Sequence, residues 1–171
     1  MHDLKDVRII KLPPATVASV QFYCEEPERA CIAVIDKFVN ESALGKVKPD
    51  TRHYGFNNPN PSPDIPEGEP DHGYEMWVTI PGDFEVPEPL VKKYFKGGLY
   101  AAKTIKMGDF NVWGLLWDWV QASEKYDYEC REPDSMGGCL EEQIDYLINL
   151  NDPAFTEEKM QLDLLVPIKI K

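Results

Sequence analysis

Residues 74–81 read YEMWVTIP, and residues 162–170 read LDLLVPIKI. In both stretches apolar side chains recur at every second position, which is the period of a β-strand with one face against a core. Aligning VTIP at 78–81 with LLVP at 164–167 indicates equivalent strands in two halves of one fold. The side chains that we expect to cover helices are Tyr74, Met76, Val78, Leu162, Leu164 and Val166.

The segments before these strands follow the same order in both halves. Residues 7–23, VRIIKLPPATVASVQFY, predict two strands around a turn at Pro13-Pro14. Residues 91–106, VKKYFKGGLYAAKTIK, predict two strands around a turn at Gly97-Gly98. The two turns therefore take equivalent places.

A helix is predicted after each strand pair. Pro27 suits the first turn of a helix that ends near Gly45. Asp109 is predicted to cap a second helix over residues 110–121. The expected core stripes are Cys31, Val34, Ile35 and Phe38 in the first helix and Phe110, Trp113, Trp117 and Val120 in the second.

Two further strands are predicted in CLEEQIDYLI at 139–148 and MQLDLLVPIKI at 160–170. Together the elements predict the α+β class, with duplicated strand-helix-strand-strand units related by a pseudo-two-fold axis. We expect an antiparallel sheet with a ligand cleft between the halves. A single domain is predicted over residues 1–171, with pseudo-repeats over about 5–82 and 90–171.

The strand faces away from the helices carry aromatic and acidic side chains. Pseudo-symmetry places Trp77 opposite Asp163, and Glu75 opposite Gln161, near the junction of the halves. Aromatic faces attract flat or cationic molecules, and a carboxylate neutralises a positive charge. The candidate ligand-binding residues are Glu141, Trp77, Glu75, Asp163, Tyr100, Phe56, Leu165, Cys139, Gln143 and Trp119.

The strand period leaves open which of two adjacent glutamates faces the cleft. Glu141 shares a strand face with Cys139 and Gln143, and Glu142 lies on the other face. Exposed edge charges remain the alternative for both. Among the tryptophans, Trp113 and Trp117 are expected in the core, and Trp119 is a candidate for a rim or a dimer contact.

The composition excludes some partners. Thirty acidic residues against 18 basic ones give a net charge of -12, which repels nucleic acid and weakens attraction to anionic lipid. No apolar run reaches the ~20 residues of a membrane span, and the first residues lack the apolar core of a secretory signal. We therefore expect a cytoplasmic protein that binds neither nucleic acid nor membrane.

Cofactor and metal motifs are missing from the sequence. The four cysteines show no CxxC pair, so we expect neither disulfides nor zinc. His53 and His72 have no spacing typical of metal ligands, and no phosphate-binding or nucleophile motif occurs. We expect no metal and no cofactor.

Five stretches together resemble the GyrI-like effector-binding family, the ligand domain also found in AraC-type and multidrug-sensing regulators. They are RHYGFNNPNPSP at 52–63, GYEMWVTIPGDFEVPEP at 73–89, FKGGLYAAKT at 95–104, CLEEQ at 139–143 and LDLLVPIKI at 162–170. The resemblance spans nearly the whole chain, and the order of the stretches carries it.

The resemblance implies two halves that frame a hydrophobic cleft with an acid inside, which meets cationic or polar parts of drug-like ligands. Glu141 matches that acid. In the last strand Asp163 matches a family acid, and Leu165 stands where family members have a tyrosine. The sequence begins at the first domain strand, so we expect a module without a DNA-binding segment that works alone, as a homodimer or with a separate regulator protein.

The leading hypothesis is a small-molecule-binding module that senses or sequesters amphipathic, cationic compounds, with Trp77, Tyr100, Glu141 and Asp163 converging on the cleft. Family likeness implies an alternative, a hydrolase of strained cyclopropane natural products, with Glu141 as base and Tyr74 or Tyr100 as donor. Whether the chain is an enzyme stays open. A third hypothesis is a protein-interaction domain that docks a partner through the proline-rich loop at 57–73.

Overall fold

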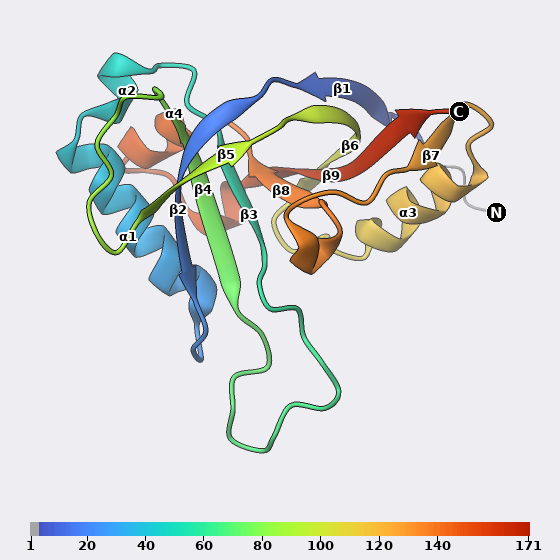
Figure 1. Cartoon of the computed structure of the whole chain (residues 1–171), viewed down its shortest axis with the longest axis horizontal. Helices are drawn as coiled ribbons and strands as arrows, with labels where there is room; N and C mark the ends of the chain where they lie inside the picture. The colour runs from blue at the N-terminus through green and yellow to red at the C-terminus, as the bar shows by residue number, and fades with distance from the viewer. Residues whose placement is uncertain (1–3) are drawn as a thin grey trace.

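The computed structural model describes residues 4–171 and shows an α+β fold, as the sequence predicts. Nine strands form one antiparallel sheet that curls into a half-barrel, in the order β1-β6-β9-β8-β3-β4-β2-β5, with β7 on β9 (Figure 1). The strands are β1 (Arg8–Leu12), β2 (Ala15–Phe22), β3 (His53–Asn57), β4 (Tyr74–Ile80), β5 (Val91–Phe95), β6 (Gly98–Lys106), β7 (Tyr126–Tyr128), β8 (Leu140–Gln143) and β9 (Gln161–Ile170).

The helices are α1 (Pro27–Glu41), α2 (Leu44–Val47), α3 (Val112–Ala122) and α4 (Tyr146–Asn151), with short 3-10 turns at η1 (Asp134–Met136) and η2 (Glu157–Lys159). Helices α1 and α3 lie toward opposite ends of the molecule in Figure 1. Strands from the two segments that are predicted as repeats pair at three places: β3 with β8 in the middle of the sheet, β1 with β6, and β2 with β5. Duplication of the two halves stays a prediction.

The predicted strand faces are confirmed. On β4, Met76 and Val78 belong to the core cluster that α1 covers through Cys31 and Ile35. On β9, Leu162, Leu164 and Val166 belong to a separate cluster with Leu116 and Val120 of α3. The period of two predicts the buried face because successive side chains of a strand point to opposite faces of the sheet. A shift of the pattern by one residue would exchange the two faces.

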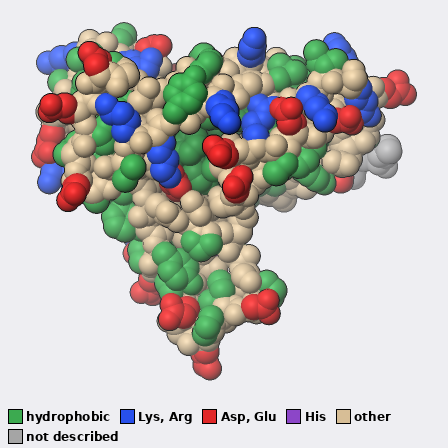
Figure 2. All heavy atoms as spheres, in the orientation of Figure 1, with side chains coloured by type: hydrophobic (Ala, Val, Ile, Leu, Met, Phe, Trp, Pro, Cys, Tyr) green, Lys and Arg blue, Asp and Glu red, His purple; other side chains and the backbone are tan. Residues whose placement is uncertain are grey.

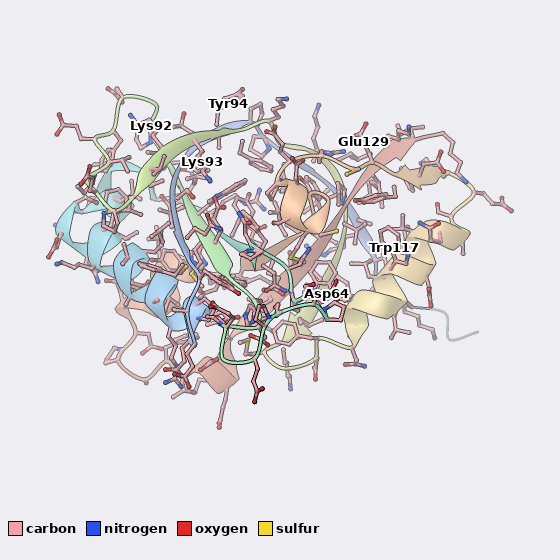
Figure 3. The ribbon with its side chains drawn as sticks, turned by 60° about the horizontal axis from the view of Figure 1, so that its bottom comes forward. Asp64, Lys92, Lys93, Tyr94, Trp117 and Glu129 are labelled. Atoms are coloured by element: carbon pink, nitrogen blue, oxygen red, sulfur yellow. The ribbon has the colours of Figure 1, made fainter. Side chains whose placement is uncertain are left out.

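The second helix differs from its prediction at its start and on its buried face. It begins at Val112, and its N-cap is Asn111 rather than Asp109. The buried positions are Leu116 and Val120, whereas Trp117 is 39% exposed (Figure 3). The predicted stripe overweighted tryptophan, whose large ring more often stays partly exposed than a leucine side chain does.

The segment predicted as one strand over 139–148 is also different. Strand β8 ends at Gln143, and Asp145 takes a left-handed backbone conformation with φ 55°, which turns the chain into α4. The apolar residues of α4 then pack under α1 through Tyr146. A short apolar run does not distinguish a strand from a helix, so the periodicity could not place this turn.

The proline-rich loop lies between β3 and β4, as predicted, and protrudes from the sheet (Figures 1 and 2). Its ends are joined by a hydrogen bond from the Asn58 amide to the Gly73 carbonyl at 2.8 Å. Tyr23 anchors the loop by donating to the Pro70 carbonyl at 2.7 Å. Within residues 4–171, no helix combines the length and the apolar character needed to cross a membrane.

Candidate ligand-binding cleft

A cleft of about 800 Å³ opens on the helix-bearing face of the sheet. Strands β3, β4 and β8 form its floor, the first turn of α1 forms one wall, and the start of α3 forms another. The volume lies within the range of ~300–1,000 Å³ that is typical of small-molecule sites. Aromatic side chains in the lining come from Tyr74, Phe110, Trp113 and Phe155.

Glu141 is the acid on the floor of this cleft. Its Oε2 accepts a hydrogen bond from the Tyr74 hydroxyl at 2.6 Å, and its Oε1 accepts a longer one from Trp113 Nε1 at 3.4 Å. Burial raises the pKa of Glu141, and these two hydrogen bonds only partly offset that effect. No lysine or arginine of the described chain, residues 4–171, forms an ion pair with this carboxylate.

Gly55 makes the Tyr74–Glu141 contact geometrically possible. In the sheet, β3 lies between β4 and β8, and Gly55 pairs with Glu141. The Tyr74 side chain therefore crosses over Gly55 to reach the carboxylate. A Cβ atom at position 55 would lie 2.4 Å from the Tyr74 hydroxyl oxygen, which is too close for any real side chain.

Acidic side chains also surround the mouth of the cleft. Glu25, Glu26, Glu28, Asp71 and Glu157 line it. The two basic side chains of the lining are engaged with them. Arg29 pairs with Glu26 at 3.2 Å, and His72 contacts Glu28 at 2.7 Å and Asp71 at 2.6 Å. A mouth with this excess of carboxylates attracts cations and repels anions.

His53 lies deeper on the same floor, two residues along β3 from Gly55. Its ring stacks on Tyr146 of α4, with centroids 4.5 Å apart and planes inclined by 14°. Burial lowers the pKa of His53 to about 4, so the ring is neutral at physiological pH. Across residues 4–171, no group hydrogen-bonds either of its ring nitrogens.

A second cavity, of about 1190 Å³, opens on the other face of the sheet. The buried acid there is Glu75, which accepts hydrogen bonds from Ser19 and Trp77 at 2.6 Å, from Asn58 at 2.8 Å and from Lys93 at 2.5 Å. Lys93, labelled in Figure 3, reaches it from β5, which is an edge strand of the sheet. Burial alone would raise the pKa of Glu75, but these donors outweigh burial and lower it.

The structure therefore separates the residues that were expected to converge. Glu141 and Gln143 line the cleft on the helix-bearing face, whereas Glu75 and Trp77 line the second cavity. The sheet itself lies between the two groups. Glu142, the alternative to Glu141, points away from the cleft and binds Arg52 through two hydrogen bonds of 2.5 and 2.7 Å.

The remaining candidates line neither cavity. Asp163 accepts hydrogen bonds from Arg8 at 2.5 Å and Thr104 at 2.6 Å. The other five pack in hydrophobic clusters. Phe56, Tyr100 and Leu165 belong to the cluster of Trp77, and Cys139 and Trp119 pack in the cluster beside α3. These side chains lie outside the cleft that contains Glu141.

Sequence reasoning missed His53, Gly55 and Met76 as residues of the cleft floor and placed Trp113 in the core. Strand alternation could have found the first two, because they lie on the face of β3 opposite to Tyr54 and Phe56. The contribution of α3 carried no signal, since it depends on how the helix sits over the sheet.

Comparison with known proteins identifies the family. The family model of integron-associated effector binding proteins, Cass2, matches residues 8–168. A comparison with curated proteins found no match. The match to an effector-binding family confirms the GyrI-like resemblance of the sequence.

Three solved structures have the same fold. The EcmrR C-terminal domain is 13% identical, with a TM-score of 0.64 over 96% of this chain and 97% of that one. An uncharacterized conserved protein from Listeria innocua is 11% identical, with a TM-score of 0.62 over 98% and 94% of the two chains. A hydrolase from Listeria innocua is 10% identical, with a TM-score of 0.59 over 96% and 92%.

At these identities the structures establish the fold alone, so the assignment rests on the family model. That model covers all nine strands at least in part, together with both helices that wall the cleft. The chain belongs to the family of integron-associated effector binding proteins, Cass2.

Proposed function

We propose that the protein binds small amphipathic cations in the cleft between α1 and α3, for sensing or for sequestration, with Glu141 as the charge partner. One observation carries the proposal. Glu141 is a partly buried carboxylate on the floor of an aromatic cleft, and within residues 4–171 it receives only neutral hydrogen-bond donors. A ligand in the cleft would shield this carboxylate from water, and a charge shielded in this way is normally paired, so a positively charged ligand would be favoured.

The aromatic lining adds the second requirement of such a ligand. The ring faces of Trp113 and Tyr74 attract a cation that is shielded from water, and apolar neighbours such as Met76 favour a hydrophobic body. The acidic mouth raises the local concentration of cations before they enter. Membership of an effector-binding family supports the same reading.

Binding of a cation should also be linked to pH. Burial raises the pKa of Glu141, and a cation beside the carboxylate favours its ionised form. The cation therefore binds the deprotonated protein more tightly and releases a proton on binding wherever Glu141 is still protonated. Affinity for a permanently charged cation should rise with pH until Glu141 is fully ionised.

Calorimetric titration with rhodamine 6G, a permanently charged aromatic dye, tests the proposal. Glu141→Gln should weaken binding about 100-fold, since a charge pair ~4 Å apart contributes up to ~4 kcal/mol at an effective dielectric constant of about 20. Glu124→Gln is the matched control, because Glu124 is exposed and lines neither cavity. The proposal fails if both variants bind the dye equally well.

One observation also favours a second candidate, a hydrolase of strained cyclopropane compounds. The Tyr74 hydroxyl lies 2.6 Å from Glu141, and a hydroxyl donor beside a carboxylate of raised pKa suits acid-base chemistry on an electrophilic ring. The test is product formation from a cyclopropane-containing alkylating compound. Product beyond one equivalent of protein that is lost in Glu141→Gln supports catalysis, and a plateau at one equivalent rejects it.

A further inference from the structure

His53 is a buried polar side chain for which residues 4–171 provide no hydrogen-bond partner. It is 4% exposed, and neither ring nitrogen has a hydrogen bond within residues 4–171. An unsatisfied buried polar group destabilises a fold, so a protein seldom keeps one without a use for it. An apolar side chain of the same shape would stack on Tyr146 equally well.

The position of His53 connects it to the ligand. It lines the same cleft as Glu141, and β3–β8 pairing fixes the spacing between them. Gly55 lies directly opposite Glu141, and His53 is two residues further along the strand. At ~3.4 Å per residue, the histidine lies roughly 7 Å along the floor from the carboxylate.

The chemistry of the ring defines what it can bind. A neutral imidazole has one nitrogen that donates and one that accepts, so it suits an uncharged group such as a hydroxyl or an amide. Its nitrogens are covered from solvent, and Met76 lies on the same part of the floor. Methionine is flexible enough to move aside when a ligand group enters.

Resting on the proposed function, we propose that His53 is a second recognition point of the cleft, which selects cations with a hydroxyl or amide group at the end remote from the charge. Glu141 neutralises the positive group, and His53 hydrogen-bonds the neutral group roughly 7 Å further along the floor. The ligand class thereby narrows from any amphipathic cation to one with polar groups at both ends.

Two matched pairs of amines test the specificity: tyramine against phenethylamine, and serotonin against tryptamine. Each pair differs by one hydroxyl group on the ring, remote from the ammonium group. The wild-type protein should bind the hydroxylated member about fivefold to tenfold more tightly, as expected for one buried hydrogen bond. His53→Phe, which keeps a stacking ring, should bind both members equally, and His53→Gln, which keeps a donor and an acceptor, should retain part of the preference.

The free protein provides an independent measurement. The substitution His53→Phe removes no hydrogen bond to any group of residues 4–171, so it should raise the melting temperature by about 2–4 °C. A lower melting temperature would show that the ring nitrogens have a structural role and would overturn the inference.

The binding outcomes separate this inference from the proposed function. Equal binding within both pairs by the wild type, or a preference that survives His53→Phe, overturns the role of His53. If the amines still bind in a manner that Glu141→Gln abolishes, the proposed function stands without it. If no amine and no cationic dye binds the wild type, both fail together.

Discussion

Replacing Gly55 by alanine tests the geometry of the cleft floor at a position that has no side chain of its own. The added Cβ would lie 2.4 Å from the Tyr74 hydroxyl oxygen and 2.7 and 2.9 Å from two carbons of the same ring. The ring must move, and the 2.6 Å hydrogen bond from Tyr74 to Glu141 is then broken or lengthened.

The sign of the effect depends on two opposing terms. Gly55 lies in a strand and has no left-handed φ, so alanine would by itself stabilise the fold by about 0.5–1 kcal/mol. Overpacking in a core costs about 1–3 kcal/mol, and loss of a hydrogen bond to a charged group adds about 1.5–3 kcal/mol. We expect a net destabilisation of about 3 kcal/mol, which lowers the melting temperature by roughly 6–12 °C.

Urea denaturation of four proteins isolates the cause: the wild type, Gly55→Ala, Tyr74→Ala and the double variant. Without the tyrosine ring, Gly55→Ala should become neutral or slightly stabilising. Gly114→Ala is the control, because a Cβ there meets no atom within 4 Å and alanine favours the helix by about 1 kcal/mol. A Gly55→Ala protein as stable as the wild type, or a penalty that persists without Tyr74, would refute the argument.

Three further outcomes concern the buried ion pairs. Lys93→Met should destabilise the protein by about 1–2 kcal/mol in urea denaturation, less than for a fully buried pair because Lys93 is 43% exposed. The pKa of Glu75 is lowered in the fold, so the ionised carboxylate stabilises the protein fully above the unfolded pKa of ~4.3. This stabilisation is lost as pH falls through the folded pKa. The free energy of unfolding of Lys93→Met should therefore fall less steeply with decreasing pH than that of the wild type. Arg52→Met should cost about 2–3 kcal/mol, since it leaves Glu142 buried without a cation.

Much of the fold could be predicted because its strands obey a simple alternation. Tyr74, Met76 and Val78 face α1, and Trp77 faces away from it, as the period of two requires. The turn at Asp145 could not be predicted, because a left-handed aspartate leaves no mark in the hydrophobic pattern. The hydrophobic alternation therefore predicts which face of a strand is buried but does not predict where a strand or helix ends.

The candidate site was predictable only in part, because a strand pattern says which residues share a face and not where that face opens. Glu141 and Gln143 were correctly placed on one face of β8. Glu141 and Trp77 could not converge as expected, because their side chains lie on opposite faces of the sheet. That expectation came from the pseudo-symmetry between β4 and β9, which does not predict where α3 packs on the sheet.

Comparison of the acids in the two cavities explains why the smaller cavity is the better candidate for a cation site. Glu75 and Glu141 are the same residue type, each on the floor of a cavity and each hydrogen-bonded to an aromatic side chain. Glu75 also receives the Lys93 ammonium group, which lowers its pKa, so a cationic ligand would have to displace that group. Within residues 4–171 no cation pairs with Glu141, and burial raises its pKa.

The raised pKa of Glu141 means that a cationic ligand can gain binding free energy by pairing with its carboxylate. Each pKa unit by which burial disfavours the ionised Glu141 is worth about 1.4 kcal/mol, and a cation that restores the charge pair recovers part of it. A neutral ligand of the same shape recovers none. Selectivity for cations in this cleft should therefore weaken when Glu141 is already protonated, and a permanently charged dye and a neutral polycyclic compound should differ most in affinity at high pH.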